Sequence, residues 1–389
     1  MVSVSWAAVR KEFPTLNHSV YLNSCSLGLL SNSSREAVNQ FLDLWTGSGA
    51  AAWYGPWFSK IAQLRQEFAR LINAQEGEIA IVPSISTGLA AISSSLDFFP
   101  RNRVVVTELD FPTIAHHFLA FSRKGLETLL VPSDDNVHID LARFEEVIND
   151  KTALVVTSRV FFTSGYIQDV ASLADVCHRN GALLLVDDYQ ATGQIPIDVK
   201  STGIDVLLTG GLKWLLGGPG IAYMYVREDL IEDLNPTATG WFANRDQFDF
   251  DPQKMVFKKD ARRFESGTPA VSAVYAGTAG ISRVNELGSQ TIRDRTLDLT
   301  QDLVSRLGEE GFSLRIPGDP DRHASITIVK ASNPQDIVSE LSKRNVIVDA
   351  RPGGVRISPY FYNDFEDNRC LITALQDIRS ESPGWFVTS

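Results

Sequence analysis

The sequence predicts an α/β protein whose larger part is a seven-stranded, mostly parallel sheet, joined to a smaller α+β unit. Three observations lead to this fold class. Between about residues 79 and 226, short apolar runs alternate with helix-period segments, as in successive βα units. These runs consist almost entirely of Val, Ile and Leu, which indicates strands covered by helices on both faces. From about residue 281 onward, helix-period segments surround isolated apolar strands instead.

The large sheet is expected to contain one reversed strand. About a dozen residues, among them Gly217-Gly218-Pro219-Gly220, separate the sixth apolar run from the seventh. That segment leaves no room for a crossover helix, so these two strands should be antiparallel. The seven expected strands are 79–82, 104–107, 128–131, 154–157, 183–186, 206–208 and 221–226.

Helices are expected between these strands, several of them preceded by Thr, Asp or Ser at a capping position. They lie at about 87–99, 113–124, 140–149 and 170–180. The segment from about 235 to 270 is rich in Asp, Phe, Arg and Gly and has no clear period. Loops of that length in compact proteins are usually functional or interface-forming. We interpret this segment as a wall of the active site.

A chain of 389 residues is too long for one compact core and predicts two domains. After residue 281, a strand at 326–329, a helix near 334–344 and a strand near 346–349 form a separate α+β pattern. We therefore expect a large α/β domain over residues 19–278. The small α+β domain would combine residues 1–18 with 279–389.

Composition excludes several classes of protein. A net charge of -11 and a pI near 5.1 oppose binding to nucleic acid or anionic lipid, which needs clustered Lys and Arg. Three distant cysteines exclude a disulfide framework and a CxxC metal site, and no metal is expected. The opening residues lack a basic segment followed by an apolar core, and no apolar run approaches the roughly 20 residues that span a bilayer. We expect a cytoplasmic protein.

Two residues whose side chains could take part in a reaction follow buried strands of the predicted sheet. Asp187 ends the run 183–186, and Lys213 follows the run 206–208. Ligands of open α/β sheets bind beyond the carboxyl ends of strands, so both side chains should reach one site. Apolar neighbours disfavour the ammonium form of Lys213 and leave a nucleophilic amine. The alternatives are that Asp187 binds Mg²⁺ or caps a helix, and that Lys213 is a surface lysine.

Spaced motifs surround these two residues and extend over nearly the whole chain. Near them stand Asp187-x-x-Gln190, Gly193 with Pro196 and Asp198, Asp205, Gly211-x-Lys213 and Gly218-Pro219-x-Gly220. Farther away stand Tyr21-Leu22-Asn23 with Ser26-Leu27-Gly28, Phe111-Pro112-Thr113, Arg263-Phe264-Glu265-Ser266-Gly267-Thr268-Pro269, and Val355-Arg356-Ile357-Ser358-Pro359 with Tyr362-Asn363. The set resembles the class V aminotransferases, pyridoxal 5'-phosphate enzymes of fold type I. Kynureninase looks like the nearest named member, and the group also includes cysteine desulfurases, C–S lyases and isopenicillin-N epimerase.

The resemblance implies how the cofactor is held. Lys213 would carry pyridoxal 5'-phosphate as a Schiff base, and Asp187 would pair with its ring nitrogen, which makes the ring an electron sink. Gln190 would hydrogen-bond the phenolic oxygen, and Phe111 would lie against the pyridine face. Without the resemblance, Gln190 reads as a loop residue and Phe111 as a core residue.

The phosphate is expected at a helix start. Ser86 and Thr87 follow a strand and open a helix, so their hydroxyls and N–H groups would bind it. A helix cap is the other interpretation of this pair. Trp241 would wall the pocket near the phosphate, or simply pack. Thr268 matches a residue that reaches the phosphate across a dimer interface, which implies a homodimer with shared active sites; alone, it reads as a turn threonine.

The substrate side of the site is also implied by the motifs. Arg356 matches the arginine that grips the α-carboxylate of an amino-acid substrate, a task that suits a planar guanidinium. Asn23 and Ser26 belong to a motif expected to contribute to substrate binding. A structural ion pair is the alternative for Arg356.

Departures from the family pattern narrow the chemistry. Residues 345–355 contain no cysteine, which argues against persulfide chemistry of the desulfurase kind. Leu212 stands where kynureninases have tyrosine and desulfurases histidine, so one polar contact is absent. Phe161-Phe162 implies a more apolar pocket than in relatives.

We expect a pyridoxal-phosphate enzyme acting on an amino acid. Kynureninase-like or β-lyase chemistry is favoured over transamination and epimerisation, because Arg356 and its flanks match the former group more closely. A catalytically idle cofactor-binding protein is the non-enzyme alternative. A nucleotide-dependent transferase is opposed by the missing phosphate-loop motif.

Overall fold

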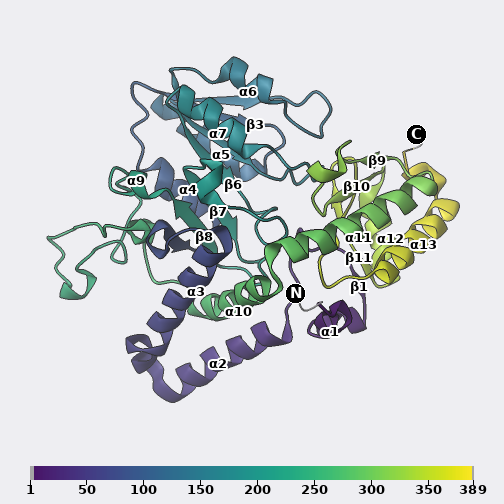
Figure 1. Ribbon diagram of the computed structural model, residues 1–389, viewed down its shortest axis with the longest axis horizontal. Coiled ribbons are helices and arrows are strands. Elements are labelled where there is room, and N and C mark those ends of the chain that lie inside the picture. Colours follow the sequence, from purple (N-terminus) through teal and green to yellow (C-terminus); the bar gives the residue numbers. More distant parts are fainter. Residues whose placement is uncertain (1–3, 388–389) are drawn as a thin grey trace.

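The computed structural model describes residues 4–387 and shows two units side by side (Figure 1). The larger contains a seven-stranded sheet with strand order β2-β8-β7-β6-β5-β3-β4, and the smaller contains the C-terminal part of the chain from α11 onward. The long helix α11 runs along the smaller unit and starts beside the larger one. The predicted fold class is confirmed.

The seven-stranded sheet is mixed, with β8 as its reversed strand. β8 pairs antiparallel with both β2 and β7, while the remaining neighbours are parallel. The antiparallel β7–β8 pair predicted from the short connection is therefore confirmed. The strands are β2 Ile79–Val82, β3 Arg103–Thr107, β4 Glu127–Val131, β5 Thr152–Ser158, β6 Leu183–Asp187, β7 Val206–Gly210 and β8 Ala222–Val226.

Successive residues of the central strands point into two different cores. In β6, Leu184 and Val186 pack with α3, α7 and α10, whereas Leu185 packs with α4 and α5. Both faces are thus covered, which explains the nearly unbroken Val/Ile/Leu content of the strands. The covering helices are α3 Pro56–Ile72, α4 Ile85–Ser93, α5 Pro112–Leu119, α6 Leu141–Val147, α7 Val170–Arg179 and α10 Val271–Leu287; two short helices of the same unit are α8 Val199–Thr202 and α9 Glu228–Ile231.

The smaller unit is a four-stranded antiparallel sheet of order β12-β13-β10-β9 packed against helices. The N-terminal segment returns to it, because β1 (Val20–Tyr21) pairs in parallel with β11 (Val346–Ile347). Helix α10 runs through residues 278 and 279, and the domain division made there stays a prediction. The remaining elements are α1 Trp6–Arg10, α2 Asn32–Ser48, α11 Ser289–Glu309, α12 Pro334–Lys343, α13 Phe365–Glu381, β9 Leu314–Arg315, β10 Thr327–Lys330, β12 Asp349–Arg351 and β13 Gly354–Ile357.

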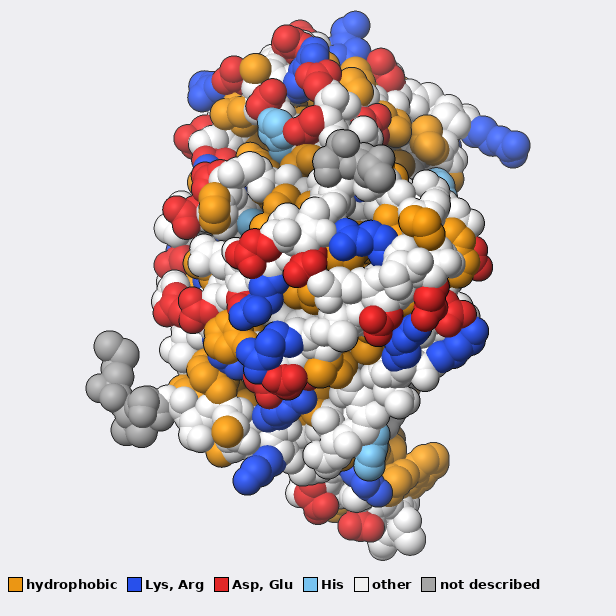
Figure 2. Space-filling view, turned by 90° about the vertical axis from the view of Figure 1, so that its right-hand side faces the viewer, with side chains coloured by type: hydrophobic (Ala, Val, Ile, Leu, Met, Phe, Trp, Pro, Cys, Tyr) orange, Lys and Arg blue, Asp and Glu red, His pale blue; other side chains and the backbone are white. Residues whose placement is uncertain are grey.

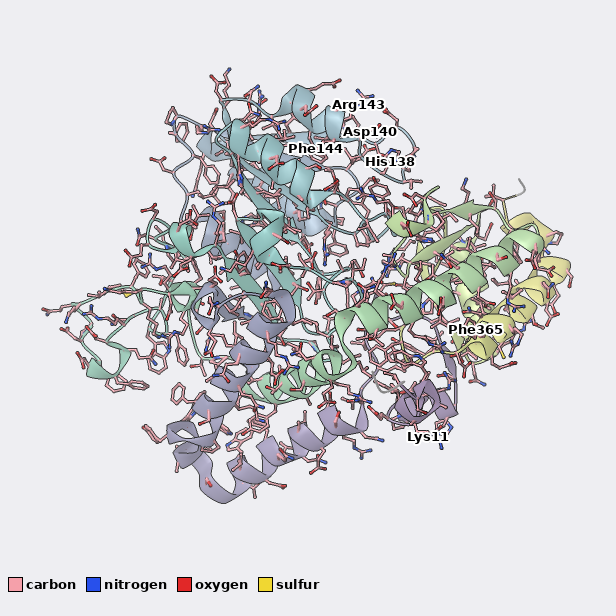
Figure 3. All side chains as sticks on the ribbon, viewed as in Figure 1. Lys11, His138, Asp140, Arg143, Phe144 and Phe365 are labelled. Atoms are coloured by element: carbon pink, nitrogen blue, oxygen red, sulfur yellow. The ribbon has the colours of Figure 1, made fainter. Side chains whose placement is uncertain are left out.

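The surface carries intermixed charges. Acidic and basic side chains alternate over the face in Figure 2, which is the side of the smaller unit. Some ion pairs are local: His138 lies between Asp135 and Asp140, at 2.7 and 3.1 Å, at the outer edge of the larger unit (Figure 3). In the described part of the chain, no helix is both long and apolar enough to cross a membrane.

Candidate active site

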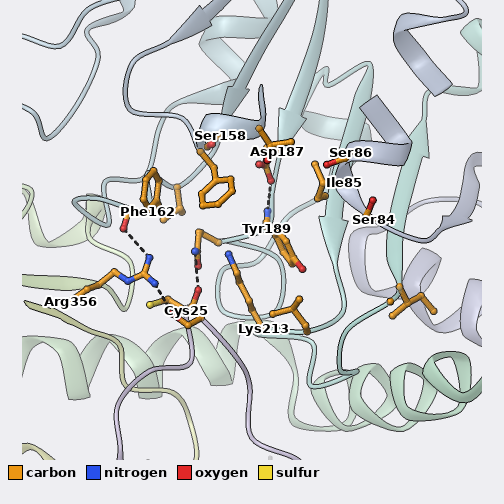
Figure 4. Close-up of a pocket in the computed structure, with 18 of the residues that line it drawn as sticks. Cys25, Ser84, Ile85, Ser86, Ser158, Phe162, Asp187, Tyr189, Lys213 and Arg356 are labelled. Carbon is orange, nitrogen blue, oxygen red and sulfur yellow. Dashed lines mark hydrogen bonds between the residues drawn. The ribbon is translucent and has the colours of Figure 1, made fainter. Parts of the chain in front are cut away.

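A cavity of about 390 Å³ opens at the carboxyl ends of the central strands, between the two units (Figure 4). This is where an open α/β sheet binds its ligand, and the volume lies in the range of small-molecule sites. Seven of the predicted site residues line it: Ser26, Ser86, Phe111, Asp187, Gln190, Lys213 and Arg356.

Asp187 is the last residue of β6 and lines this cavity at the carboxyl end of the strand. Its Oδ1 accepts the backbone N–H of Tyr189 at 3.0 Å, and the side chain is almost fully buried. The neighbouring aspartates have structural partners instead. Asp110 joins β3 to β5 by accepting the N–H groups of Thr107 and Ser158, and Asp188 forms a buried pair with Arg159, whose Nε lies 2.6 Å from Asp188 Oδ1. Asp187 alone is left to serve a ligand.

Lys213 lies in the turn that follows β7. The N-terminal loop holds this turn, because the N–H of Gly28 donates to Leu212 O at 2.8 Å. A Cβ on Gly28 would stand 2.1 Å from Lys213 O, so only glycine permits this approach. The Lys213 amine has no hydrogen bond or ion pair to another described residue and lies 4.2 Å from the centre of the Tyr189 ring. It is free to react.

Burial sets the ionisation of both groups. It raises the pKa of Asp187, against the Tyr189 N–H bond and the positive charge of Lys213. It lowers the pKa of Lys213 well below the ordinary lysine value, against the negative charge of Asp187. Asp187 would therefore gain from a buried cation, and the Lys213 amine loses its proton more readily than an ordinary lysine.

The start of α4 forms one end of the cavity. Ser84 caps the helix, since its Oγ accepts the Thr87 N–H at 3.2 Å and lies 3.0 Å from Thr87 Oγ1. Ser86 lines the cavity, whereas Thr87 lies behind it and does not. The first N–H groups of a helix have no partner inside it and favour an anion.

Gln190 is fixed by two contacts. Its Nε2 donates to Cys25 O at 3.1 Å, and its Oε1 accepts Trp214 Nε1 at 3.0 Å. An amide nitrogen carries two hydrogens, so one donor of Gln190 remains for a ligand. Phe111 and Phe162 meet edge to face at 5.4 Å between ring centres and, with Leu212, make this part of the lining apolar.

Arg356 lies at the opposite end from α4 and is almost completely buried. Its Nη2 donates to Ser26 Oγ at 2.7 Å and pairs with Asp349 Oδ2 at 3.0 Å. Asp349 also pairs with Arg351 at 2.6 Å. Arg356 Nε is buried without a partner in the described residues, and Nη1 donates to Phe162 O at 3.4 Å. Burial alone would raise the pKa of Asp349, but Ser26 and the two arginines hold it below its ordinary value.

Besides Thr87, three predicted residues do not line the cavity. Asn23 lies in the adjoining loop, where it bridges to Ser358. Thr268 lines a separate hollow of about 70 Å³ that shares Pro83, Gly220 and Ile221 with the cavity. Trp241 is half-exposed and contacts Phe242, Phe248 and Phe250. No described residue of 235–270 lines the cavity within one chain. Part of this segment projects from the larger unit (Figure 1), and its later residues Phe264 and Glu265 are buried against that unit.

Sequence reasoning missed several charged or polar residues in or beside the cavity, among them Tyr189, Asp349 and Arg351. Tyr189 stands between Asp187 and Gln190, so its place next to two predicted residues was a signal. The pairing of Asp349 with Arg356 depends on strand register, since the two are direct partners across β12 and β13. No cluster of three metal-ligating side chains occurs in residues 4–387.

The fold and the lysine–aspartate pair in its cavity define a class, the pyridoxal-phosphate enzymes built on an α/β sheet. Residues 36–369 match the family model described as Aminotransferase class-V, and the chain belongs to that family. It is 37% identical over 93% of its length to an uncharacterized aminotransferase, YcbU, of Bacillus subtilis, covering 95% of that protein. It is 29% identical over 96% of its length to a kynureninase of Shouchella clausii, covering 92% of it.

Solved structures of other proteins have the same fold as this chain. An apo cysteine desulfurase of Thermococcus onnurineus NA1 superimposes with a TM-score of 0.88 at 22% identity, over 98% of this chain and 100% of that one. A mutant of C-DES with glycine covalently linked to its PLP cofactor gives 0.87 at 22% identity, over 95% and 99%. Pyridoxal 5'-phosphate is the cofactor of this family. The residues present fit it: an amine without a partner, a buried carboxylate and an anion-binding helix start.

Proposed function

We propose that this enzyme cleaves the side chain of an amino acid by kynureninase-like or β-lyase chemistry. The observation that carries the proposal is the shared cavity, in which the free amine of Lys213 lies between Asp187 and the carboxylate-binding group Arg356. Kynureninases among the relatives and a cystine C–S lyase among the solved structures support the reaction type.

Different residues of the cavity would hold the ring nitrogen and the phosphate of the cofactor. Asp187 would hold a proton at the pyridine nitrogen, and the α4 start with Ser86 and Thr87 would bind the phosphate. Bound pyridoxal 5'-phosphate supplies a ring that accepts the electrons of a bond broken at the substrate α-carbon. Lys213, whose pKa is lowered by burial, would take the α-proton and return it.

The substrate would lie between Lys213 and Arg356. Arg356 and Ser26 would bind its carboxylate. That carboxylate, together with Asp349, would balance the two charges of Arg351 and Arg356. An acidic substrate side chain would leave a negative charge unpaired in the cavity, and Phe111 and Phe162 offer it no partner. The arrangement therefore favours a neutral, apolar or aromatic side chain.

A product assay separates the possible reactions. The purified holoenzyme is incubated with kynurenine, cystine, cysteine and unbranched neutral amino acids, with and without a keto acid. Side-chain cleavage releases anthranilate, or pyruvate with ammonia and sulfide, and needs no keto acid. Turnover that depends strictly on a keto acid would identify a transaminase, and formation of the opposite enantiomer with solvent deuterium at the α-carbon would identify an epimerase. Either result overturns the proposed reaction.

The proposal includes a homodimer in which Thr268 of one chain completes the phosphate site of the other. Exposed apolar residues of the 235–270 segment, Trp241, Phe248, Phe250 and Met255, support a covering partner. We also propose a cytoplasmic location, supported by cysteines that are all free, Cys25, Cys177 and Cys370.

A further inference from the structure

Tyr189 occupies a central place in the cavity. Its backbone N–H holds Asp187, and its ring lies under the amine of Lys213, 4.2 Å away. Its phenol oxygen makes no hydrogen bond to another described residue. A phenol inside a ligand cavity with no protein partner has a donor available for the ligand.

The Tyr189 ring lies directly against Gly210, where a side chain would leave it no room. A Cβ at residue 210 would stand 2.2 Å from Cε2 and 2.5 Å from the phenol oxygen of Tyr189, distances that real Cβ atoms do not reach. Any side chain at 210 would therefore displace the ring. Gly210 is the last residue of β7, so the phenol rests against the cavity end of that strand.

The phenol also lies toward the anion-binding end of the cavity. Gly210 pairs with Ala222, which in turn pairs with Val82, the residue at which β2 ends before α4 begins. In Figure 4 the Tyr189 oxygen points to the side of Ser84 and Ser86, away from Arg356. An anion held at the start of α4 would thus have the phenol as a neighbour.

The chemistry of the group fits donation to an anion. Burial, with the negative charge of Asp187, raises the pKa of Tyr189, so the phenol keeps its proton. Leu212, in the turn before Lys213, offers no polar atom. A hydrogen bond from a neutral donor to a charged acceptor is stronger than one between neutral groups.

We propose that Tyr189 binds the cofactor by donating its phenol hydrogen to the phosphate of pyridoxal 5'-phosphate, with its ring supporting the lysine amine from below. This rests on the phosphate lying at the start of α4, as given under the proposed function. Tyr189 is then a phosphate ligand supplied by the strand end of β6, beside Asp187 and Gln190.

The test compares two aldehydes that differ only in the phosphate. Full-length protein stripped of cofactor is titrated with pyridoxal 5'-phosphate and with pyridoxal, and binding is followed by the visible absorbance of the lysine-bound aldehyde. Tyr189→Phe should weaken binding of the phosphorylated aldehyde by roughly tenfold to a hundredfold, the range for a hydrogen bond to a charged group. Binding of pyridoxal should stay within about twofold of wild type. Tyr54→Phe, at an exposed position, is the matched control and should change neither.

Two outcomes overturn the inference. Equal weakening of both aldehydes would mean that the phenol acts on the ring or the amine, and unchanged affinities would mean that it binds nothing. If wild-type protein takes up neither aldehyde, the proposed function fails as well. Gly210→Ala provides a second test, because it should weaken binding of pyridoxal 5'-phosphate but not of pyridoxal. In a protein that already carries Tyr189→Ala, adding Gly210→Ala should change the affinity little, because the ring that it displaces is absent.

Discussion

Asp349 and Arg356 are direct cross-strand partners, with Asp349 Oδ2 3.0 Å from Arg356 Nη2. The pair orients the guanidinium within the cavity, and Ser26 holds both members. Asp349 uses one edge of the guanidinium, while Nε remains without a partner in the described residues. We predict that this guanidinium binds the carboxylate of the substrate.

Replacing Arg356 tests this role. Arg356→Lys keeps the charge and loses the planar fork, so kcat/KM should fall about tenfold to a hundredfold, as expected for a hydrogen bond to a charged group. Steady-state kinetics measure the effect, and Arg143→Lys, on the exposed edge of the larger unit, should leave the rate unchanged. Loss of cofactor or of folding in Arg356→Lys would instead make this arginine a structural partner of Asp349.

The two adjacent aspartates should respond differently to the same change. Asp187→Asn removes the charge that would face the pyridine nitrogen, so kcat should fall at least about a hundredfold, the range for losing one preorganised group that stabilises charge in a transition state. Its melting temperature should change little. Asp188→Asn breaks the buried pair with Arg159 and should lower the melting temperature instead. Equal effects of both changes on stability would argue against a cofactor role for Asp187.

The sequence predicted the residues whose position depends only on where the strands end. Asp187 and Lys213 were found because both follow apolar strands, and strand ends meet at one edge. It failed where side chains decided the outcome. The helix expected at 87–99 ends at Ser93, since Ser94 and Ser95 hydroxyls bond back to Ala91 O.

Long-range pairing was the other limit. The Asp349–Arg356 contact follows from the register of two short strands, which the sequence does not determine. The length of 235–270 and its lack of a clear period indicated function or an interface, but the contacts of Trp241 with Phe248 and Phe250 depend on the tertiary structure.

Acid should destabilise the fold through His323. This imidazole is buried and bonds to Ile326 O at 2.8 Å, and burial lowers its pKa to about 4. In the unfolded chain it titrates near 6.5. The unfolded state therefore binds a proton first, and stability present above pH 6.5 is lost as pH falls toward 4, by about 1.4 kcal/mol per pKa unit. Melting curves should show a shallower loss over this window for His323→Gln; parallel curves would exclude the effect.

Mixing two inactive chains tests the shared site. Lys213→Ala and Thr268→Ala should each have low activity, and their mixture should recover part of it, since a heterodimer assembles one intact site. The recovery is measured after joint refolding, with each variant refolded alone as control. A wild-type protein that is a fully active monomer at high dilution would contradict the arrangement.

The most direct measurement concerns the covalent attachment at Lys213. The holoenzyme is reduced with borohydride, which converts a lysine–cofactor C=N bond to a stable amine, then digested and mapped by mass spectrometry. The account predicts the pyridoxyl mass on the peptide that contains Lys213, and its absence from Lys213→Ala protein, which should also lose the yellow colour. A label on a different lysine, or no label in a coloured wild-type protein, would contradict the assignment of this cavity as the active site.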